Sequence, residues 1–148
     1  MVAQPKNEHA LELALNSFAG SNIRAVEYRD NLFEALGFPR PNAIPLMPLP
    51  FQIAQKLHGV TSPGNDRARD LIDLQLIMSL FVIDMEATAD VCRRLFKYRR
   101  RQPWPPQISK GTSWDALYTE QRGSLPVLPT ADEAVAWANA LIARLDNV

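Results

Sequence analysis

Apolar residues recur at intervals of three and four over most of the chain after residue 50, the spacing of one face of an α-helix. Five helices are predicted in this way, over about 50–59, 66–82, 85–98 and 114–122 and from Thr130 onward. Pro50 suits a first helical position, Gly59 is expected to end the first helix, and Asp66 is expected to cap the second. Thr130 and Glu133 have the spacing of a capping box. The pattern therefore predicts a mostly α fold, a helical bundle.

The apolar pattern also predicts which helices are central. Nearly every position from Leu71 to Val82 is apolar, and a helix with so little polar face belongs in the middle of a fold. The next helix carries one apolar stripe and the closing helix another, formed by Ala89, Cys92 and Phe96 and by Ala134, Ala138, Leu141, Ile142 and Leu145. We expect these stripes to form the core.

Prolines and glycines mark the organisation of the first third of the chain. A helix is expected from a cap at Asn7 to Gly20, and one or two short strands are allowed near it, the first over 23–28. Prolines then recur through residues 39–50, where missing N–H groups exclude helix interior and central strand. We expect a single domain over 1–148, with a helix and strand in 1–38, an extended connector in 39–50 and a helical part in 51–148.

Composition narrows the class of protein. The sequence is 47% hydrophobic and 22% charged, which excludes a disordered chain, and its 16 basic and 16 acidic residues predict no partner through net charge. No apolar stretch reaches the roughly 20 residues of a membrane helix and no export signal is visible, so the expected location is the cytoplasm. The single cysteine, Cys92, excludes a disulfide framework and a cysteine zinc site and is expected to be a buried structural thiol.

Three carboxylates fall along one line of the second helix. Asp66, Asp70 and Asp73 are spaced by four and three residues, and Asp73 lies among apolar neighbours, so it needs a partner. Arg69, four residues earlier, can form a structural ion pair with Asp73. Lys56 can reach Asp70 or Asp73 from the preceding helix, because the connecting loop is short. This arrangement fits a packed ion-pair network as well as a site.

The third helix ends in a run of cations. Six of the sixteen basic residues lie within nine positions and precede Trp104: Arg93, Arg94, Lys97, Arg99, Arg100 and Arg101. Cations beside aromatic rings suit nucleic acid, with phosphates on the charges and bases on the rings. The alternative is a solvated helix end whose arginines face the C-terminal dipole. His9 and His58 have no second histidine at ligand spacing, so no metal site is predicted.

The segments QIAQKLHG (52–59) and DRARDLIDLQLI (66–77) resemble the C-terminal motif of the AbiEii/AbiGii toxin family, nucleotidyltransferase-like proteins of bacterial toxin–antitoxin and phage-defence loci. The resemblance implies transfer of a nucleotide from a nucleoside triphosphate to an acceptor, which is tRNA in some members. It implies that Lys56 contacts the triphosphate, that Asp70 acts as base or orienter, and that Asp73 supports them. The corresponding fold is the C-terminal helical portion of a nucleotidyltransferase.

The sequence departs from the family in its metal-binding residues. Such enzymes hold Mg²⁺ with an Asp-x-Asp pair after a Gly-Ser turn, and this sequence contains no Asp-x-Asp. We therefore expect a chain that lacks the metal-binding half, carries no cofactor of its own and is inactive alone, with Mg²⁺ and a triphosphate implied for the full-length family. The sequence leaves open whether it is an enzyme. The alternatives are a non-catalytic helical module that binds RNA or an antitoxin, and a purely structural domain.

Overall fold

The computed structural model describes residues 25–26, 35–37 and 44–148. The chain divides into two compact units, Met1–Pro48 and Leu49–Val148. In the first unit β1 (Ala25–Val26) pairs antiparallel with β2 (Ile44–Pro45). The expected helix between Asn7 and Gly20 lies outside the described residues, as does most of the expected strand over 23–28. The single-domain organisation stays a prediction.

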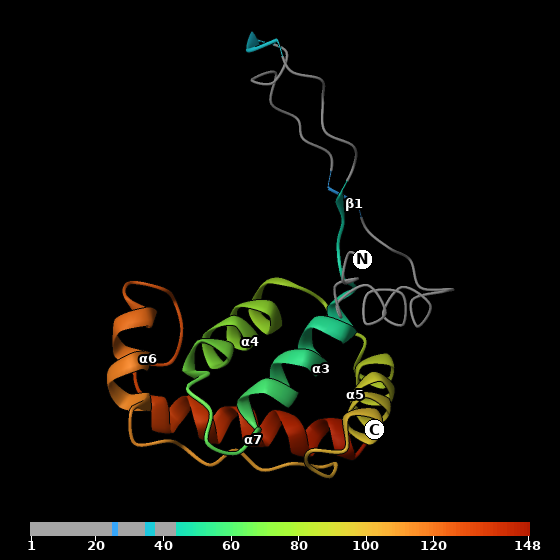
Figure 1. The fold of residues 1–148 in the computed structure, drawn as a ribbon, viewed down its shortest axis with the longest axis vertical. Coiled ribbons are helices and arrows are strands. Elements are labelled where there is room, and N and C mark those ends of the chain that lie inside the picture. The colour runs from blue at the N-terminus through green and yellow to red at the C-terminus, as the bar shows by residue number, and fades with distance from the viewer. Residues whose placement is uncertain (1–24, 27–34, 38–43) are drawn as a thin grey trace, which may run out of the picture. The chain divides into compact units, whose positions relative to one another are not determined.

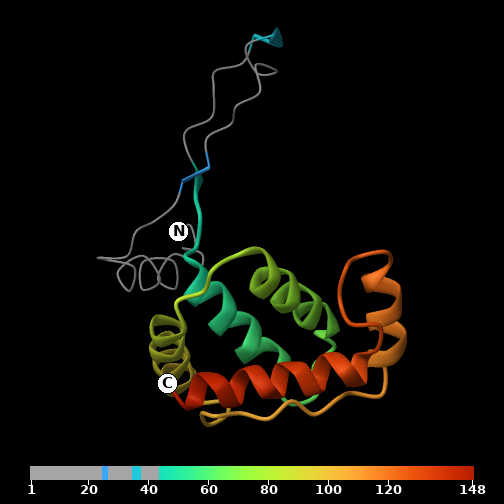
Figure 2. The ribbon, with the colours of Figure 1, turned by 180° about the vertical axis from the view of Figure 1, so that it is seen from behind.

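The second unit is helical, which confirms the predicted fold class. Its helices are α3 (Leu49–Val60), α4 (Ala68–Leu80), α5 (Met85–Arg99), α6 (Trp114–Arg122) and α7 (Ala131–Asp146). Figure 1 shows α3 and α4 side by side, with α5 and α6 at opposite ends and α7 running behind them. Figure 2, from the other side, shows α7 spanning the unit in front. No helix within the described ranges is long and apolar enough to cross a bilayer.

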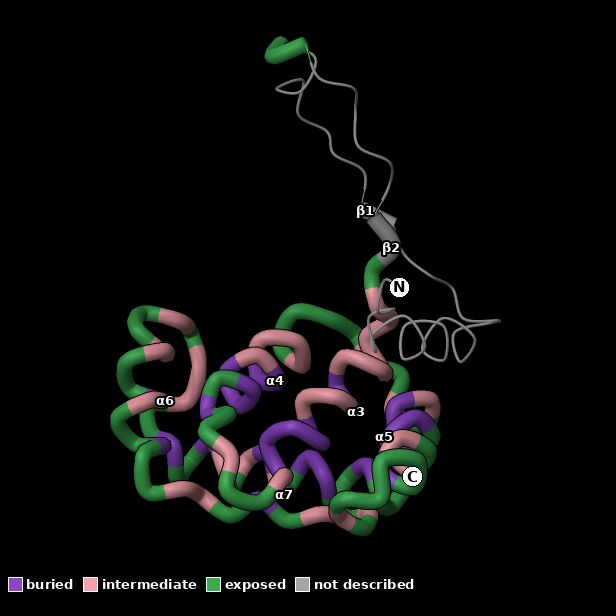
Figure 3. The backbone as a smooth tube through the Cα atoms, in the orientation of Figure 1, coloured by how far each residue is buried: buried purple, intermediate pink, exposed green. Residues whose placement is uncertain are grey.

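The core of this unit consists of the predicted apolar stripes. Figure 3 shows the buried segments of the helices facing one another. All three stripe residues of α5 and all five of α7 are buried, which confirms both stripes. Trp114 and Tyr118 of α6 are fully buried. The central position of α4 is also confirmed, because it packs against α3, α6 and α7. Its last turn is the exception: Leu80 is 71% exposed.

A buried polar network joins α4 to α6 and to the loop before α7. The Gln75 side-chain amide donates to the Leu71 carbonyl at 3.0 Å and to the Tyr118 hydroxyl at 3.1 Å, and its oxygen accepts from the Leu128 amide at 2.8 Å. The Tyr118 hydroxyl donates to the Leu128 carbonyl at 2.8 Å. Each of these buried polar groups therefore has a partner, so hydrogen bonds offset the desolvation cost and the network fixes the loop.

Two predicted helix boundaries are wrong. Helix α3 continues through Gly59 to Val60, because Gly59 has an ordinary helical backbone and serves a close contact instead of a turn. Helix α4 starts at Ala68, with Arg67 at the N-cap position, so Asp66 is not its cap. The Asn65 side chain accepts from the Arg67 amide at 2.8 Å, and Asp66 instead accepts from the Ser113 hydroxyl at 2.9 Å. A local turn closed by Asn65 thus delays the helix.

Helix α4 ends at Leu80, before the predicted end near residue 82, and the remaining boundaries follow the predicted signals. Thr130 accepts from the Glu133 amide at 3.2 Å and begins α7, as the capping-box spacing predicts. Asp84 accepts from the Ala87 amide at 2.9 Å and caps α5. At the other end of α5, Arg100 has φ 53° and ψ 26°, a left-handed conformation, and its amide donates to the Phe96 carbonyl. This turn directs the following residues away from the helix axis.

We predict that Arg100→Gly stabilises the protein. A left-handed backbone costs a residue with a Cβ atom about 1–2 kcal/mol, and glycine avoids most of that cost at the C-terminus of a helix, although it gains freedom in the unfolded chain. Urea denaturation is expected to show a gain of about 0.5–1 kcal/mol in the free energy of unfolding. A loss of stability would show that the Arg100 side chain contributes more than its backbone strain costs.

Candidate functional site

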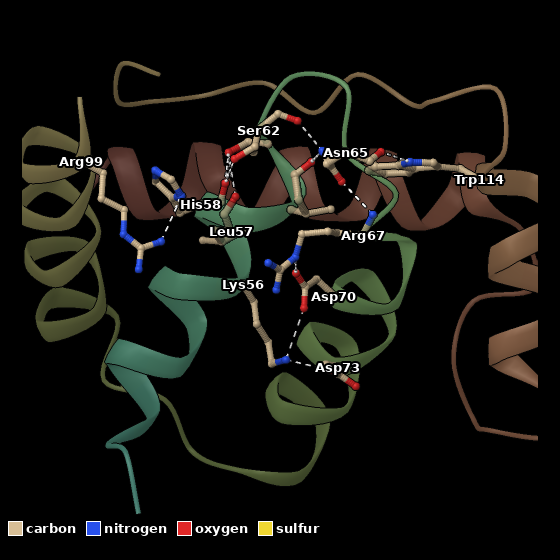
Figure 4. Close-up of polar contacts among 12 residues, drawn as sticks. Lys56, Leu57, His58, Ser62, Asn65, Arg67, Asp70, Asp73, Arg99 and Trp114 are labelled. Atoms are coloured by element: carbon tan, nitrogen blue, oxygen red, sulfur yellow. Dashed lines mark hydrogen bonds and ion pairs between the residues drawn. The ribbon is translucent and has the colours of Figure 1, made fainter. Parts of the chain in front are cut away.

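The Lys56 ammonium lies between two carboxylates of the neighbouring helix. Its Nζ atom is 2.7 Å from Asp73 Oδ2 and 3.4 Å from Asp70 Oδ1, and Figure 4 shows the three side chains meeting between α3 and α4. The short loop between the helices predicts this proximity. The Lys56 side chain remains 25% exposed, so it is held by its carboxylate partners and is still partly open to solvent.

Two arginines complete the Lys56 cluster, which comprises Lys56, Arg67, Arg69, Asp70 and Asp73. Arg67 Nε lies 2.6 Å from Asp70 Oδ2, and Arg69 Nε lies 3.2 Å from Asp73 Oδ1. The predicted contact between Arg69 and Asp73 is therefore present. Each carboxylate pairs with Lys56 and with one arginine that comes three or four residues before it in the sequence.

The more buried carboxylate is Asp70, not Asp73. The Asp70 side chain is 7% exposed and that of Asp73 is 26% exposed. The expectation that Asp73 is embedded among apolar residues is thus wrong, because its side chain lies at the edge of the helix pair beside Lys56 and Arg69. Partial burial raises the pKa of Asp73, but hydrogen bonds from Lys56 and Arg69 outweigh it and hold this pKa below its ordinary value.

The cluster depends on the absence of a side chain at Gly59. A Cβ atom at this position would lie 2.7 Å from Arg67 Nε and 2.9 Å from Asp70 Oδ2. Such distances are far below van der Waals contact, so glycine is required where the Arg67–Asp70 pair packs against the last turn of α3. Neither Gly59 nor Arg67 is a site residue in the sequence-based prediction. The sequence signal that could have identified both residues is their position inside the two motif segments, 52–59 and 66–77.

His58 links the end of α3 to the basic run. It is 4% exposed, and its Nδ1 atom lies 3.2 Å from Nη1 of Arg99, as Figure 4 shows. Burial lowers the pKa of His58, and the charges of Arg99, Arg101 and Arg67 lower it further. The imidazole is therefore neutral at pH 7, and Nδ1 accepts from the guanidinium. No described residue pairs with Nε2.

The six cations of the basic run have different surroundings. Arg94, Lys97, Arg99, Arg100 and Arg101 are exposed, and none of them has a carboxylate partner in the described part of the chain. Arg93 differs, because its guanidinium pairs with Asp90 at 3.6 Å and donates to the Val148 carbonyl at 3.1 Å. The Arg93 guanidinium therefore makes a structural contact with the end of α7. Nucleic-acid binding by the run stays a prediction.

The described residues do not form a magnesium site. Both carboxylates of the Lys56 cluster are neutralised by cations, and no group of three or more His, Cys, Asp or Glu side chains gathers within the described ranges. Cys92 is buried, and burial raises the pKa of its thiol to about 12 against the opposing charge of Arg93, so it is an unreactive thiol as expected.

We predict that Asp70→Ala destabilises the protein more than Asp73→Ala. Removing the buried carboxylate leaves Arg67 without a partner and Lys56 with Asp73 alone, and costs about 2–3 kcal/mol, whereas the more exposed carboxylate of Asp73 contributes about 1 kcal/mol. Urea denaturation at pH 7 measures both losses. Because the folded-state pKa of Asp73 is lowered, its contribution is complete above the ordinary value of 3.8 and disappears as the pH falls below it. Equal losses at pH 7 would contradict the assignment of Asp70 as the buried partner.

We predict that Gly59→Ala is destabilising, although alanine favours helices by about 1 kcal/mol over glycine. The added methyl group must displace Arg67 from Asp70, at a cost of about 1–3 kcal/mol. The control is the same change in an Arg67→Ala background, where most of the loss is expected to vanish. An undiminished loss there would mean that the methyl group collides with the helix pair itself.

A protein-family model matches this chain. The model, described as the nucleotidyl transferase AbiEii toxin of a type IV toxin–antitoxin system, covers residues 12–141 and so includes the whole Lys56 cluster. No curated protein matches the chain. A match over most of the sequence, with the predicted helical fold and the motif residues in contact, identifies the chain as a member of the AbiEii nucleotidyl transferase toxin family.

Proposed function

We propose that this chain is the helical part of an AbiEii nucleotidyltransferase toxin, in which Lys56 contacts the triphosphate and Asp70 fixes the position of Lys56. In nucleotide transfer an acceptor hydroxyl attacks the α-phosphorus of a nucleoside triphosphate and pyrophosphate leaves. A preorganised cation beside the phosphates stabilises the charge that develops there. The chain belongs to a family of toxins of type IV toxin–antitoxin systems, which implies an antitoxin as its partner. A role in bacterial phage defence is part of this proposal.

The observation that carries this proposal is the placement of Lys56. Its ammonium pairs with two carboxylates, which favour one position of the long side chain over its other rotamers. Restraint of this kind reduces the entropy lost when a phosphate binds. The exposed quarter of the side chain gives a triphosphate access to the ammonium.

Asp70 suits the role of orienter better than that of base. One of its oxygens accepts from Lys56 and the other from Arg67, so both are engaged in the absence of substrate. A carboxylate that takes a proton from an attacking hydroxyl needs a free oxygen facing that hydroxyl. Asp73, paired with the opposite side of Lys56, supports the same position.

The chain alone is proposed to be inactive in nucleotide transfer. Its sequence has no Asp-x-Asp pair, and the carboxylates of the Lys56 cluster are already paired with cations. No step through a metal ion is therefore assigned to its residues.

The test is a pair of measurements on the purified chain. We predict that ATP in EDTA binds weakly in a calorimetric titration, and that Lys56→Ala weakens this binding about tenfold by removing one charged contact. With Mg²⁺, labelled triphosphates and tRNA, no incorporation is expected. The matched control is Lys110→Ala, a lysine paired with Asp115 and Asp132 outside the cluster.

Two results would count against the proposal. Absence of ATP binding, or equal binding by the Lys56→Ala protein, would remove the triphosphate role of Lys56. Incorporation of nucleotide by the chain alone would overturn the proposed inactivity.

The alternative function is a non-catalytic module that binds RNA or an antitoxin. The observation that favours it is the group of five exposed cations without carboxylate partners in the described part of the chain. Under this alternative, tRNA binds in a salt-dependent manner and ATP does not bind, so the same titrations distinguish the two functions.

A further inference from the structure

A hollow of about 370 Å³ opens beside the C-terminal end of α5, outside the Lys56 cluster. Four cations and two aromatic rings line it: Arg93, Lys97, Arg100, Arg101, Phe96 and Trp104. Its volume lies within the range of about 300–1,000 Å³ of small-molecule sites. A space of this size accommodates one nucleotide.

The cations of this basic hollow fall into two groups. Arg93 donates a hydrogen bond to the chain at the end of α7 and pairs with Asp90, so it forms part of the wall of the hollow. Lys97, Arg100 and Arg101 are exposed and pair with no carboxylate among the described residues. Three unpartnered cations around one depression suit a ligand with more than one phosphate.

The aromatic wall is held rigidly. The Trp104 indole N–H donates to Asp146 Oδ1 at 2.9 Å. The Trp104 ring also meets Phe96 edge-on, at 5.3 Å between ring centroids and 72° between planes. Both contacts hold the ring in one orientation while part of it stays exposed. A fixed, partly open indole is a platform on which a base can stack at little entropic cost.

The basic hollow is connected to the Lys56 cluster through the end of α3. Gln102, which lines the hollow, donates to the His58 carbonyl at 2.8 Å and to the Thr61 hydroxyl at 2.8 Å. His58 lies two residues after Lys56. Hydrogen bonds therefore join the segment after α5 to the end of α3, the helix that carries Lys56.

We propose that the basic hollow binds one unpaired nucleotide of a single-stranded RNA, with the base stacked on Trp104 and the flanking phosphates on Lys97, Arg100 and Arg101. The proposal rests on the proposed function in taking RNA as the acceptor. A duplex keeps its bases stacked and paired, so its bases cannot reach the indole. An acidic peptide satisfies the cations but does not use the aromatic platform.

The test is a titration of the full chain with a fluorescein-labelled RNA of about eight nucleotides, as a single strand and as a duplex. We predict tighter binding of the single strand, with a slope of log K against log salt near −2 for three phosphate contacts. Tryptophan fluorescence should fall on binding, because a stacked base quenches the indole. Trp104→Phe should abolish this fall while Trp114 and Trp137 remain.

The variants locate the contact. Arg100→Gly removes a cation at a position where glycine relieves the left-handed backbone, so weaker binding cannot be attributed to unfolding. Combined with Lys97→Gln it should weaken binding about tenfold and reduce the slope by about 1.4. The matched control is Arg94→Gln, an exposed arginine on the same helix that does not line the hollow; it should change binding less than about twofold.

Three outcomes would overturn this proposal. The first is equal binding of the single strand and the duplex. The second is a loss of RNA binding in the Arg94→Gln protein as large as that in the Lys97→Gln/Arg100→Gly protein. The third is displacement of the RNA by poly-glutamate without a change in tryptophan fluorescence. The last of these would indicate an acidic protein as the ligand. Failure of the Lys56 role is separate, because Lys56→Ala is expected to leave the RNA titration unchanged while it weakens ATP binding.

Discussion

Only a residue without a side chain allows the Arg67 guanidinium and the Asp70 carboxylate to lie against the last turn of α3. This contact at Gly59 sets how closely α3 and α4 approach, and the approach brings Lys56 within reach of both carboxylates. The ion pairs are therefore a consequence of packing. The ion pairs in turn neutralise the charges that lie between two helices already joined by an apolar core.

The same end of α3 fixes the segment after α5. His58 accepts from Arg99 on one side, and its carbonyl accepts from Gln102, so the basic run has a defined place relative to the Lys56 cluster. Burial lowers the pKa of His58, and the charges of Arg99, Arg101 and Arg67 lower it further. A chain with no net charge thus places several cations near the end of one helix.

The helices were predictable because their signals are local. Helical spacing and caps such as Thr130 specify α7, and the stripe of Ala89, Cys92 and Phe96 specifies the buried face of α5. The errors arose where a distant partner decides the outcome. Gly59 is a helix terminator by local rules, but a residue of the next helix requires it inside α3.

The candidate site was predictable to the level of residue types and proximity. Spacing along α4 placed Asp70 and Asp73 near Lys56, but it could not rank their burial, because that depends on how far α4 rotates against α3. Arg67 was missed because the contact that makes it important, its packing against Gly59, joins two helices that are separated by a turn in the sequence. The sequence shows Arg93 only as a member of a basic run. Its structural contact could not be predicted, because the carbonyl that it binds lies more than fifty residues away in the sequence.

Cys92 lies at the centre of the α5 stripe, and it is the one cysteine in the sequence. A thiol reagent can react with this chain only when α5 separates from the core, because the closed helix shields the sulfur atom completely. The rate of labelling at a fixed reagent concentration then reports the population of the opened state, without an introduced probe. Cys92 is therefore a natural reporter of how often α5 opens from the core of the helical unit.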